Sequence, residues 1–298
     1  MRRGDAMTIA RGYSEAEPEA LSTQVVWLDW EQYLGWLSGK VRKAETAWGE
    51  TVKLGPPLAP GQHMPLIGPT GCAKTTHAVG VLDECRRFVL ALDPKGEDET
   101  LIKSGYIRVK ELPKQGLRSL RGEDQKTWRE IQRRIDNGGS AKVIVGGGSR
   151  TDAEDVRLQQ LMRDAITYAR HAGGWTLFVD EFELLSSQRM FKLGPLIERM
   201  LITARRDKTS VFTTFQAPAW VSKHATRQAH KAVIWQQDSD MIKNIARGMS
   251  RNWQDVAAVV DELPAFHTLT LGRGKLSGPM VMTMAPELAG KKPRTQPR

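Results

Sequence analysis

A chain of 298 residues, of which 40% are hydrophobic, can bury one sizeable core or two small ones. It has no run of about 18 apolar residues, and residues 1–23 lack an apolar core, which argues against direct membrane insertion and against a signal peptide. The formal net charge of +10, from 44 Lys and Arg against 34 Asp and Glu, favours a polyanionic partner. The chain has only two cysteines, which is typical of a reducing compartment, and we expect a cytoplasmic protein.

The first 60 residues predict a tail, a helix and a linker. Residues 1–22 have few large apolar groups, which predicts a mobile tail. Within residues 23–60, apolar side chains recur at three- and four-residue steps, as in an amphipathic helix, before a Pro/Gly-rich linker that reaches residue 62. The recurring residues are Trp27, Trp30, Tyr33, Leu34, Trp36, Leu37 and Val41. This aromatic stripe either packs on the main domain or contacts another subunit or a membrane surface.

Residues 61–286 alternate short apolar runs with helical patterns. Strands are expected at 64–67, 88–93, 106–109, 143–145, 175–180, 210–215 and 232–235, with helices beginning near 74, 97, 125, 153, 194, 238 and 254. This alternation predicts an α/β fold with a mostly parallel sheet flanked by helices, in which ligands bind at the carboxyl ends of the strands. Two final runs, 267–271 and 280–284, predict an antiparallel edge hairpin, and residues 287–298 form a basic tail.

A phosphate-binding loop is predicted between the strand at 64–67 and the helix that begins at Lys74. The segment matches the pattern G-x-x-x-x-G-K-[ST], except that Ala73 stands where the second glycine is expected. Loop amides and the helix end would surround the β-phosphate of ATP, Lys74 would reach the β- and γ-phosphates, and Thr75 would bind Mg²⁺. A left-handed conformation at Ala73 would cost about 1–2 kcal/mol. The predicted nucleotide-binding residues are Gly68, Pro69, Thr70, Gly71, Cys72, Ala73, Lys74, Thr75 and Thr76.

Two adjacent acids follow the apolar strand at 175–180. Asp180 at the strand end is the expected second Mg²⁺ ligand, and Glu181 is the expected residue that orients or deprotonates the attacking water. A solvated acidic turn after a strand is the alternative. The order of this pair after a phosphate loop favours the catalytic interpretation.

Three further side chains are candidates for the reaction. Gln216 follows the strand at 210–215 and could sense the γ-phosphate, although a surface glutamine is common at such a place. Arg205 or Arg206 could act on a neighbouring subunit's nucleotide, since a guanidinium neutralises charge on the transferred phosphoryl group. The alternative for the arginines is a basic, solvated helix end. A basic stretch over 223–231, which includes Lys231, could contact a nucleic-acid backbone.

The order of four segments resembles the FtsK–HerA superfamily of P-loop ATPases, including type IV secretion coupling proteins. The segments are GPTGCAKT at 68–75, LALDPKGE at 90–97, LFVDEFELL at 177–185 and ARRDKTSVFTTFQAPAW at 204–220. The resemblance implies a RecA-like domain over roughly residues 61–286 and a hexameric ring that translocates DNA. It also implies that an arginine of one subunit completes the site of the next, and that the turn Asp93-Pro94-Lys95-Gly96 and Gln216 match family motifs. Ala73, the lack of membrane helices and the lack of an N-terminal barrel are departures from the family.

We therefore expect an ATP-hydrolysing nucleic-acid motor, a ring-forming translocase that acts on double-stranded DNA in transfer, packaging or segregation. ATP and Mg²⁺ are the expected cofactors, and a homo-hexamer with a membrane or portal-type partner protein is the expected assembly. An accessory ATPase for virion assembly or protein secretion, docking through the aromatic helix, is one alternative. A non-hydrolysing nucleotide-binding scaffold, suggested by Ala73, is the other.

Overall fold

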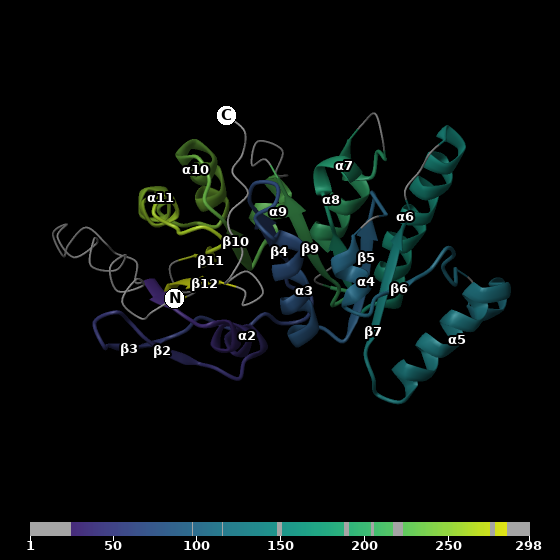
Figure 1. The fold of residues 1–298 in the computed structure, drawn as a ribbon, viewed down its shortest axis with the longest axis horizontal. Helices are drawn as coiled ribbons and strands as arrows, with labels where there is room; N and C mark the ends of the chain where they lie inside the picture. Colours follow the sequence, from purple (N-terminus) through teal and green to yellow (C-terminus); the bar gives the residue numbers. More distant parts are fainter. Residues whose placement is uncertain are drawn as a thin grey trace. The chain divides into compact units, whose positions relative to one another are not determined.

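The computed structural model describes residues 25–96, 98–114, 116–147, 151–187, 191–203, 206–216, 223–274 and 278–284 (Figure 1). The predicted tails and Arg205 lie outside these residues. The chain divides into two compact units. The first unit takes its described residues from Met1–Leu58, Pro65–His77 and Gln216–Arg298, and the second from Ala59–Met64 and Ala78–Phe215. The boundaries predicted from the sequence at residues 22, 60 and 286 stay predictions.

The second unit contains a parallel sheet with the strand order β9-β8-β5-β7-β6. Its strands are β5 (Phe88–Asp93), β6 (Ile107–Arg108), β7 (Ala141–Gly146), β8 (Thr176–Val179) and β9 (Ser210–Phe215). Every residue of β8 and β9 is buried. Strands that are buried on both faces read as continuous apolar runs, which is why the sequence pattern located them well.

The helical elements of the second unit are α4 (Glu99–Lys103), the 3-10 turn η1 (Leu117–Ser119), α5 (Gly122–Asp136), α6 (Asp152–Ala172), α7 (Phe182–Ser186) and α8 (Gly194–Thr203). Of these, α5, α6 and α7 contact strands of the sheet. The long helix α6 begins at Thr151, whose hydroxyl accepts a hydrogen bond from the Glu154 amide, and it contacts β5, β7 and β8 (Figure 1). Its buried residues recur at three- and four-residue steps and form the apolar face that covers the sheet: Leu158, Met162, Ala165, Ile166 and Ala169.

The first unit contains a mixed sheet with the order β1-β12-β11-β10-β4. Its strands are β1 (Val25–Trp27), β4 (Met64–Ile67), β10 (Lys231–Ile234), β11 (Thr268–Gly272) and β12 (Met280–Thr283). The predicted hairpin β11–β12 is antiparallel, but β1 pairs with β12 in parallel, so the prediction that this hairpin forms the sheet edge is wrong. A separate two-stranded sheet, β2 (Lys43–Glu45) with β3 (Thr51–Lys53), was not predicted.

The aromatic segment of the first unit forms α2 (Trp30–Ser38), a shorter helix than the stripe of apolar residues suggested. It begins at a capping box in which Asp29 and Gln32 bond each other's backbone amides, and it ends at Gly39 with φ 87°. Tyr33, Trp36 and Leu37 are buried. The aromatic stripe therefore packs against its own unit, as the first of the two interpretations predicted.

Four further helices complete the description. They are α3 (Lys74–Cys85), which contributes residues to both units, and α9 (Lys223–Gln228), α10 (Ser239–Gly248) and α11 (Trp253–Asp261) of the first unit. Helices α10 and α11 contact each other (Figure 1). Parallel pairing of most strands, with helices on the sheets, confirms the expected α/β class. Among the described helices, none combines the length and the apolar character needed to cross a bilayer.

His77, on the first turns of α3, is buried in an aromatic cluster of the first unit. Its Nε2 atom lies 3.1 Å from the Tyr33 hydroxyl, which lies 3.0 Å from the Thr270 hydroxyl. The rings of Trp30 and Trp235 contact it at centroid distances of 4.9 and 5.3 Å. Burial lowers the pKa of His77 from 6.5 to about 3, so the imidazole is neutral in the folded protein at neutral pH.

This cluster predicts an acid-sensitive contribution to stability. The unfolded chain protonates His77 below pH 6.5 and the folded protein does so only near pH 3, so stability that is present above pH 6.5 is lost as the pH falls. Between pH 6.5 and about pH 5, the unfolding free energy of the wild type should fall by roughly 2 kcal/mol more than that of His77→Gln. Urea unfolding at several pH values measures this difference. Exposed His171→Gln is the control, and identical pH slopes for the wild type and His77→Gln would refute the assignment.

Candidate nucleotide site

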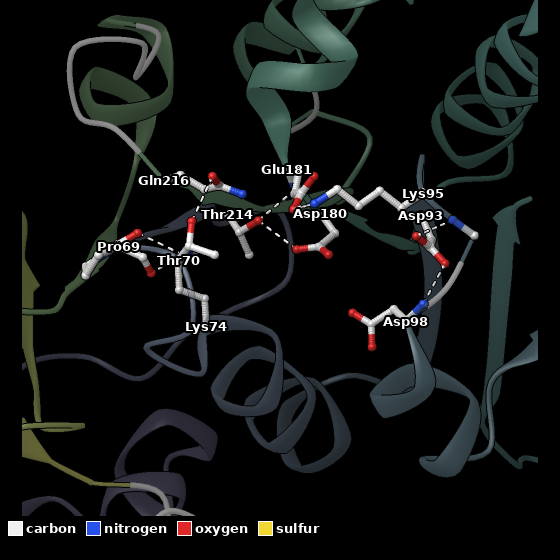
Figure 2. A network of polar contacts seen from close by, with 12 residues as sticks. Pro69, Thr70, Lys74, Asp93, Lys95, Asp98, Asp180, Glu181, Thr214 and Gln216 are labelled. Atoms are coloured by element: carbon white, nitrogen blue, oxygen red, sulfur yellow. Dashed lines mark hydrogen bonds and ion pairs between the residues drawn. The ribbon is translucent and has the colours of Figure 1, made fainter. Parts of the chain in front are cut away.

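The predicted phosphate loop connects β4 to α3 in the first unit, and its lysine, Lys74, forms hydrogen bonds to the loop backbone. Lys74 is the first residue of α3, and its Nζ atom donates 2.8 Å hydrogen bonds to the carbonyl oxygens of Gly68 and Pro69 (Figure 2). Its side chain is buried, with 8% of the residue's surface exposed. An ammonium group held inside the loop at the N-terminus of a twelve-residue helix adds to the positive end of the helix dipole, which favours an anionic ligand.

Two loop residues adopt the left-handed backbone conformation. Gly71 has φ 79° and Ala73 has φ 72°. Glycine takes this conformation without a steric penalty, whereas an alanine there loses about 1–2 kcal/mol. The departure from the motif at Ala73 therefore places a strained residue directly before Lys74.

Close packing explains the glycine at the start of the loop. A Cβ atom on Gly68 would lie 2.8 Å from Cys72 Sγ and 2.9 Å from Trp235 Cβ. No side chain fits there unless the loop moves. Burial raises the pKa of the Cys72 thiol to about 11, against the opposing effect of the Lys74 charge, so this cysteine is a packed, protonated thiol.

Gln216 lies beside the loop. Thr70 Oγ1 donates a 3.0 Å hydrogen bond to Gln216 Oε1 within the first unit (Figure 2). Of the other predicted loop residues, Thr75 and Thr76 lie on the first turn of α3 and are partly buried. We call residues 68–76 with Gln216 the phosphate-loop cluster.

The second unit holds the predicted acids at the carboxyl end of β8. Thr214, on neighbouring β9, connects them: its hydroxyl donates a 2.7 Å hydrogen bond to Asp180 Oδ1 and accepts a 2.8 Å bond from the Glu181 amide (Figure 2). Glu181 has φ 50°, a left-handed conformation at the N-terminus of α7. The hydrogen bond from the Glu181 amide to the Thr214 hydroxyl holds the backbone of Glu181, the residue that is predicted to act on water.

Strand β5 brings more acids to the same edge. Leu92 of β5 pairs with Val179 of β8, so Asp93 and Asp180 follow paired residues. The Asp93 carboxylate accepts hydrogen bonds from the amides of Gly96 and Asp98. We call Asp93, Asp98, Asp180 and Glu181 the acidic cluster.

The pKa of Asp180 is raised to about 7, mainly by burial; the charges of the neighbouring acids contribute to the rise, and the hydrogen bond from Thr214 opposes it. A carboxylate in such surroundings gains most from a bound cation, and Mg²⁺ prefers oxygen ligands. The side chains of Asp180 and Thr75 are chemically suited to this ion. Within the described residues, no group of three or more His, Cys, Asp or Glu side chains is arranged to hold a metal ion.

The arginine candidates remain predictions. Arg206 is exposed, with 77% of its side chain accessible, and its Nε donates to Asp207 at 3.1 Å. Arg205 lies outside the described residues. The idea that Lys231 belongs to a basic surface is wrong, because Lys231 is buried with its ammonium 3.9 Å from the centre of the Trp36 ring.

Sequence reasoning missed the role of Thr214 and of the Trp235 contact with Gly68. A signal for Thr214 existed, because it lies next to the carboxyl end of β9, the end of a parallel strand at which ligands bind. The Trp235 contact had no such signal, because it depends on β10 lying beside β4.

No protein-family model and no curated sequence matches the chain. Solved structures do show likeness in fold. The genome packaging NTPase B204 from Sulfolobus turreted icosahedral virus 2, in complex with AMPPCP, is 15% identical over 75% of this chain and 97% of its own, with a TM-score of 0.48. VirB4 of Thermoanaerobacter pseudethanolicus is 10% identical over 76% and 90%, with a TM-score of 0.49.

The bacterial conjugative coupling protein TrwBΔN70 is 11% identical over 92% of this chain and 95% of its own, with a TM-score of 0.49.

The left-handed conformation of Ala73 predicts that Ala73→Gly stabilises the protein. Relief of strain exceeds the entropy that glycine adds to the unfolded chain, for a net gain of about 1 kcal/mol. Ala78→Gly, in the interior of the following helix α3, should instead destabilise by about 1 kcal/mol or more. Thermal and urea unfolding compare the two variants, and a loss of stability in Ala73→Gly would contradict the backbone assignment.

Proposed function

We propose that this protein is an ATP-hydrolysing nucleic-acid motor in which the phosphate-loop cluster and the acidic cluster bind one nucleotide. The observation that carries the proposal is the phosphate loop itself, in which Lys74 reaches the Gly68 and Pro69 carbonyls between a buried strand and a helix N-terminus. Thr214, which bonds Asp180, and Gln216, which bonds Thr70, are two residues apart.

Each side chain has a role in this proposal. Loop amides and Lys74 bind the triphosphate, while Thr75 and Asp180 hold Mg²⁺, which would neutralise charge on the phosphate oxygens. Glu181 takes a proton from the attacking water, and Gln216 aligns the γ-phosphate through its position beside Thr70. Arg205 or Arg206 of a neighbouring subunit completes the site in a homo-hexameric ring.

Double-stranded DNA is the proposed polymer, in transfer, packaging or segregation, with a membrane or portal-type protein as docking partner in the cytoplasm. The net charge of +10 and the resemblance of the motifs to DNA-translocating ATPases support this choice. A protein-directed accessory ATPase is less well supported, because the aromatic face of α2, its proposed docking element, is buried.

A nucleotide-binding scaffold without hydrolysis is the second candidate. The observation that favours it is Ala73 at φ 72°, since a strained residue immediately before Lys74 raises the energy of the loop conformation that positions the lysine. This candidate predicts that ATP binds and that no phosphate is released, with or without DNA.

Phosphate release from ATP tests the proposal directly. The wild type should hydrolyse ATP, and double-stranded DNA should raise its rate. Glu181→Gln should bind ATP but lose activity by about 100-fold or more, because an amide does not accept the water's proton. The isosteric change Glu99→Gln, on an exposed α4 side chain, is the matched control and should leave the rate unchanged.

Three other outcomes have clear meanings. A hydrolysis rate that does not change when DNA is added would shift the assignment to a protein-directed ATPase. ATP binding without phosphate release would favour the scaffold. Undiminished turnover in Lys74→Ala would refute the nucleotide site altogether.

A further inference from the structure

Lys95 occupies a fixed position in the turn that follows β5. The turn Asp93-Pro94-Lys95-Gly96 is held at both ends, because the Asp93 carboxylate accepts hydrogen bonds from the amides of Gly96 and Asp98 at 2.9 and 3.3 Å. Pro94 restricts the backbone, and Gly96 adopts φ 72°. Arg108 also contacts the turn, because its Nη2 atom donates a 3.2 Å hydrogen bond to the Gly96 carbonyl oxygen.

The Lys95 ammonium forms an ion pair with the predicted water-activating residue. Its Nζ atom lies 2.5 Å from Glu181 Oε1, within the second unit (Figure 2). The bond to Glu181 is the main cause that raises the pKa of Lys95, so the lysine is charged at neutral pH. The Thr214 hydroxyl holds the Glu181 backbone at the same time, so both the main chain and the side chain of this residue are restrained.

Such a pair acts against general-base catalysis. A carboxylate takes a proton from water through an oxygen lone pair directed at that water, and an ammonium bound to Oε1 occupies that oxygen. The pair is also easily separated, because 59% of the Lys95 side chain is exposed and exposed ion pairs contribute little to stability. Hydrogen bonds hold the turn while the lysine side chain is open to solvent, which suits a restraint that opens without unfolding.

We infer that Lys95 is a positioning residue that restrains Glu181, and that hydrolysis accelerates when a phosphate oxygen of bound nucleic acid takes Glu181's place on the Lys95 ammonium. This inference rests on the proposed function and names how the site is regulated. Lysine is a phosphate ligand of the point-charge type, so an exposed ammonium exchanges a carboxylate for a phosphate with no change in its own charge state.

Lys95→Met tests the restraint, because methionine keeps the length of the side chain and removes its charge. If Glu181 is restrained about nine-tenths of the time, basal kcat should rise about tenfold, with KM for ATP unchanged and further stimulation by DNA largely lost. Lys95→Arg, which keeps a cation, should retain the low basal rate. Lys103→Met is the matched control, since Lys103 pairs with Glu99 at 2.6 Å on the exposed α4 and should affect neither rate.

The readouts separate this inference from a structural role and from the proposed function. A merely structural lysine would change the melting temperature or KM and would leave the ratio of DNA-stimulated to basal kcat as it was. If the wild type hydrolyses ATP and basal kcat in Lys95→Met is equal or lower, the restraint is refuted while the function stands. If neither protein hydrolyses ATP, both proposals fail. If basal kcat rises but DNA still stimulates Lys95→Met in full, nucleic-acid phosphate is not the group that takes over Lys95, and the inference is overturned in that part.

Discussion

The carboxylate of Asp180 follows a strand whose four residues are all buried, and its pKa is raised to about 7, mainly by burial. Three other acids, Asp93, Asp98 and Glu181, belong to the same cluster, and their charges contribute to this rise. Concentrated negative charge at a buried strand end is costly unless hydrogen bonds or cations compensate it. Much of the second unit's local structure supplies that compensation: Thr214 donates to Asp180, two amides donate to Asp93, and Lys95 pairs with Glu181. A divalent cation would complete it.

In the first unit the buried charge is positive, and it belongs to Lys74. Lys74 is buried, and two backbone carbonyls hold its ammonium in the loop. In this loop Ala73 adopts a left-handed backbone conformation, which is strained for alanine and unstrained for glycine. Strain of this kind persists where the surrounding structure fixes the conformation, and here Gly68 packs against Cys72 and Trp235 with no room for a side chain. The N-terminal aromatic helix supports the same region through the contact of Tyr33 with His77.

The sequence predicted the parts of the fold whose patterns are local. The strand before Gly68, the helix from Lys74 and the strand before Asp180 were all placed correctly, because each joins a continuous apolar run to a motif residue. The three-residue strand β1 was missed, since so few residues show no alternation and its place beside β12 depends on a distant pairing. Helix α2 ends sooner than its apolar pattern because Gly39 adopts a left-handed conformation. Thr214 looked like an ordinary strand residue, because β-branched residues favour strands whatever their hydroxyls contact. The strand order β9-β8-β5 is what places Thr214 of β9 beside Asp180 and Glu181 at the end of β8.

The central claim is that the phosphate-loop cluster and the acidic cluster bind the same Mg²⁺ and nucleotide. A double-mutant cycle on Thr75→Val and Asp180→Asn, with ATP affinity measured by calorimetry with and without Mg²⁺, tests it most directly. If both side chains hold one ion, the two losses of Mg²⁺-dependent affinity should be coupled by more than about 0.5 kcal/mol. Losses that add within about 0.5 kcal/mol, or a Mg²⁺ dependence that neither substitution changes, would contradict the account.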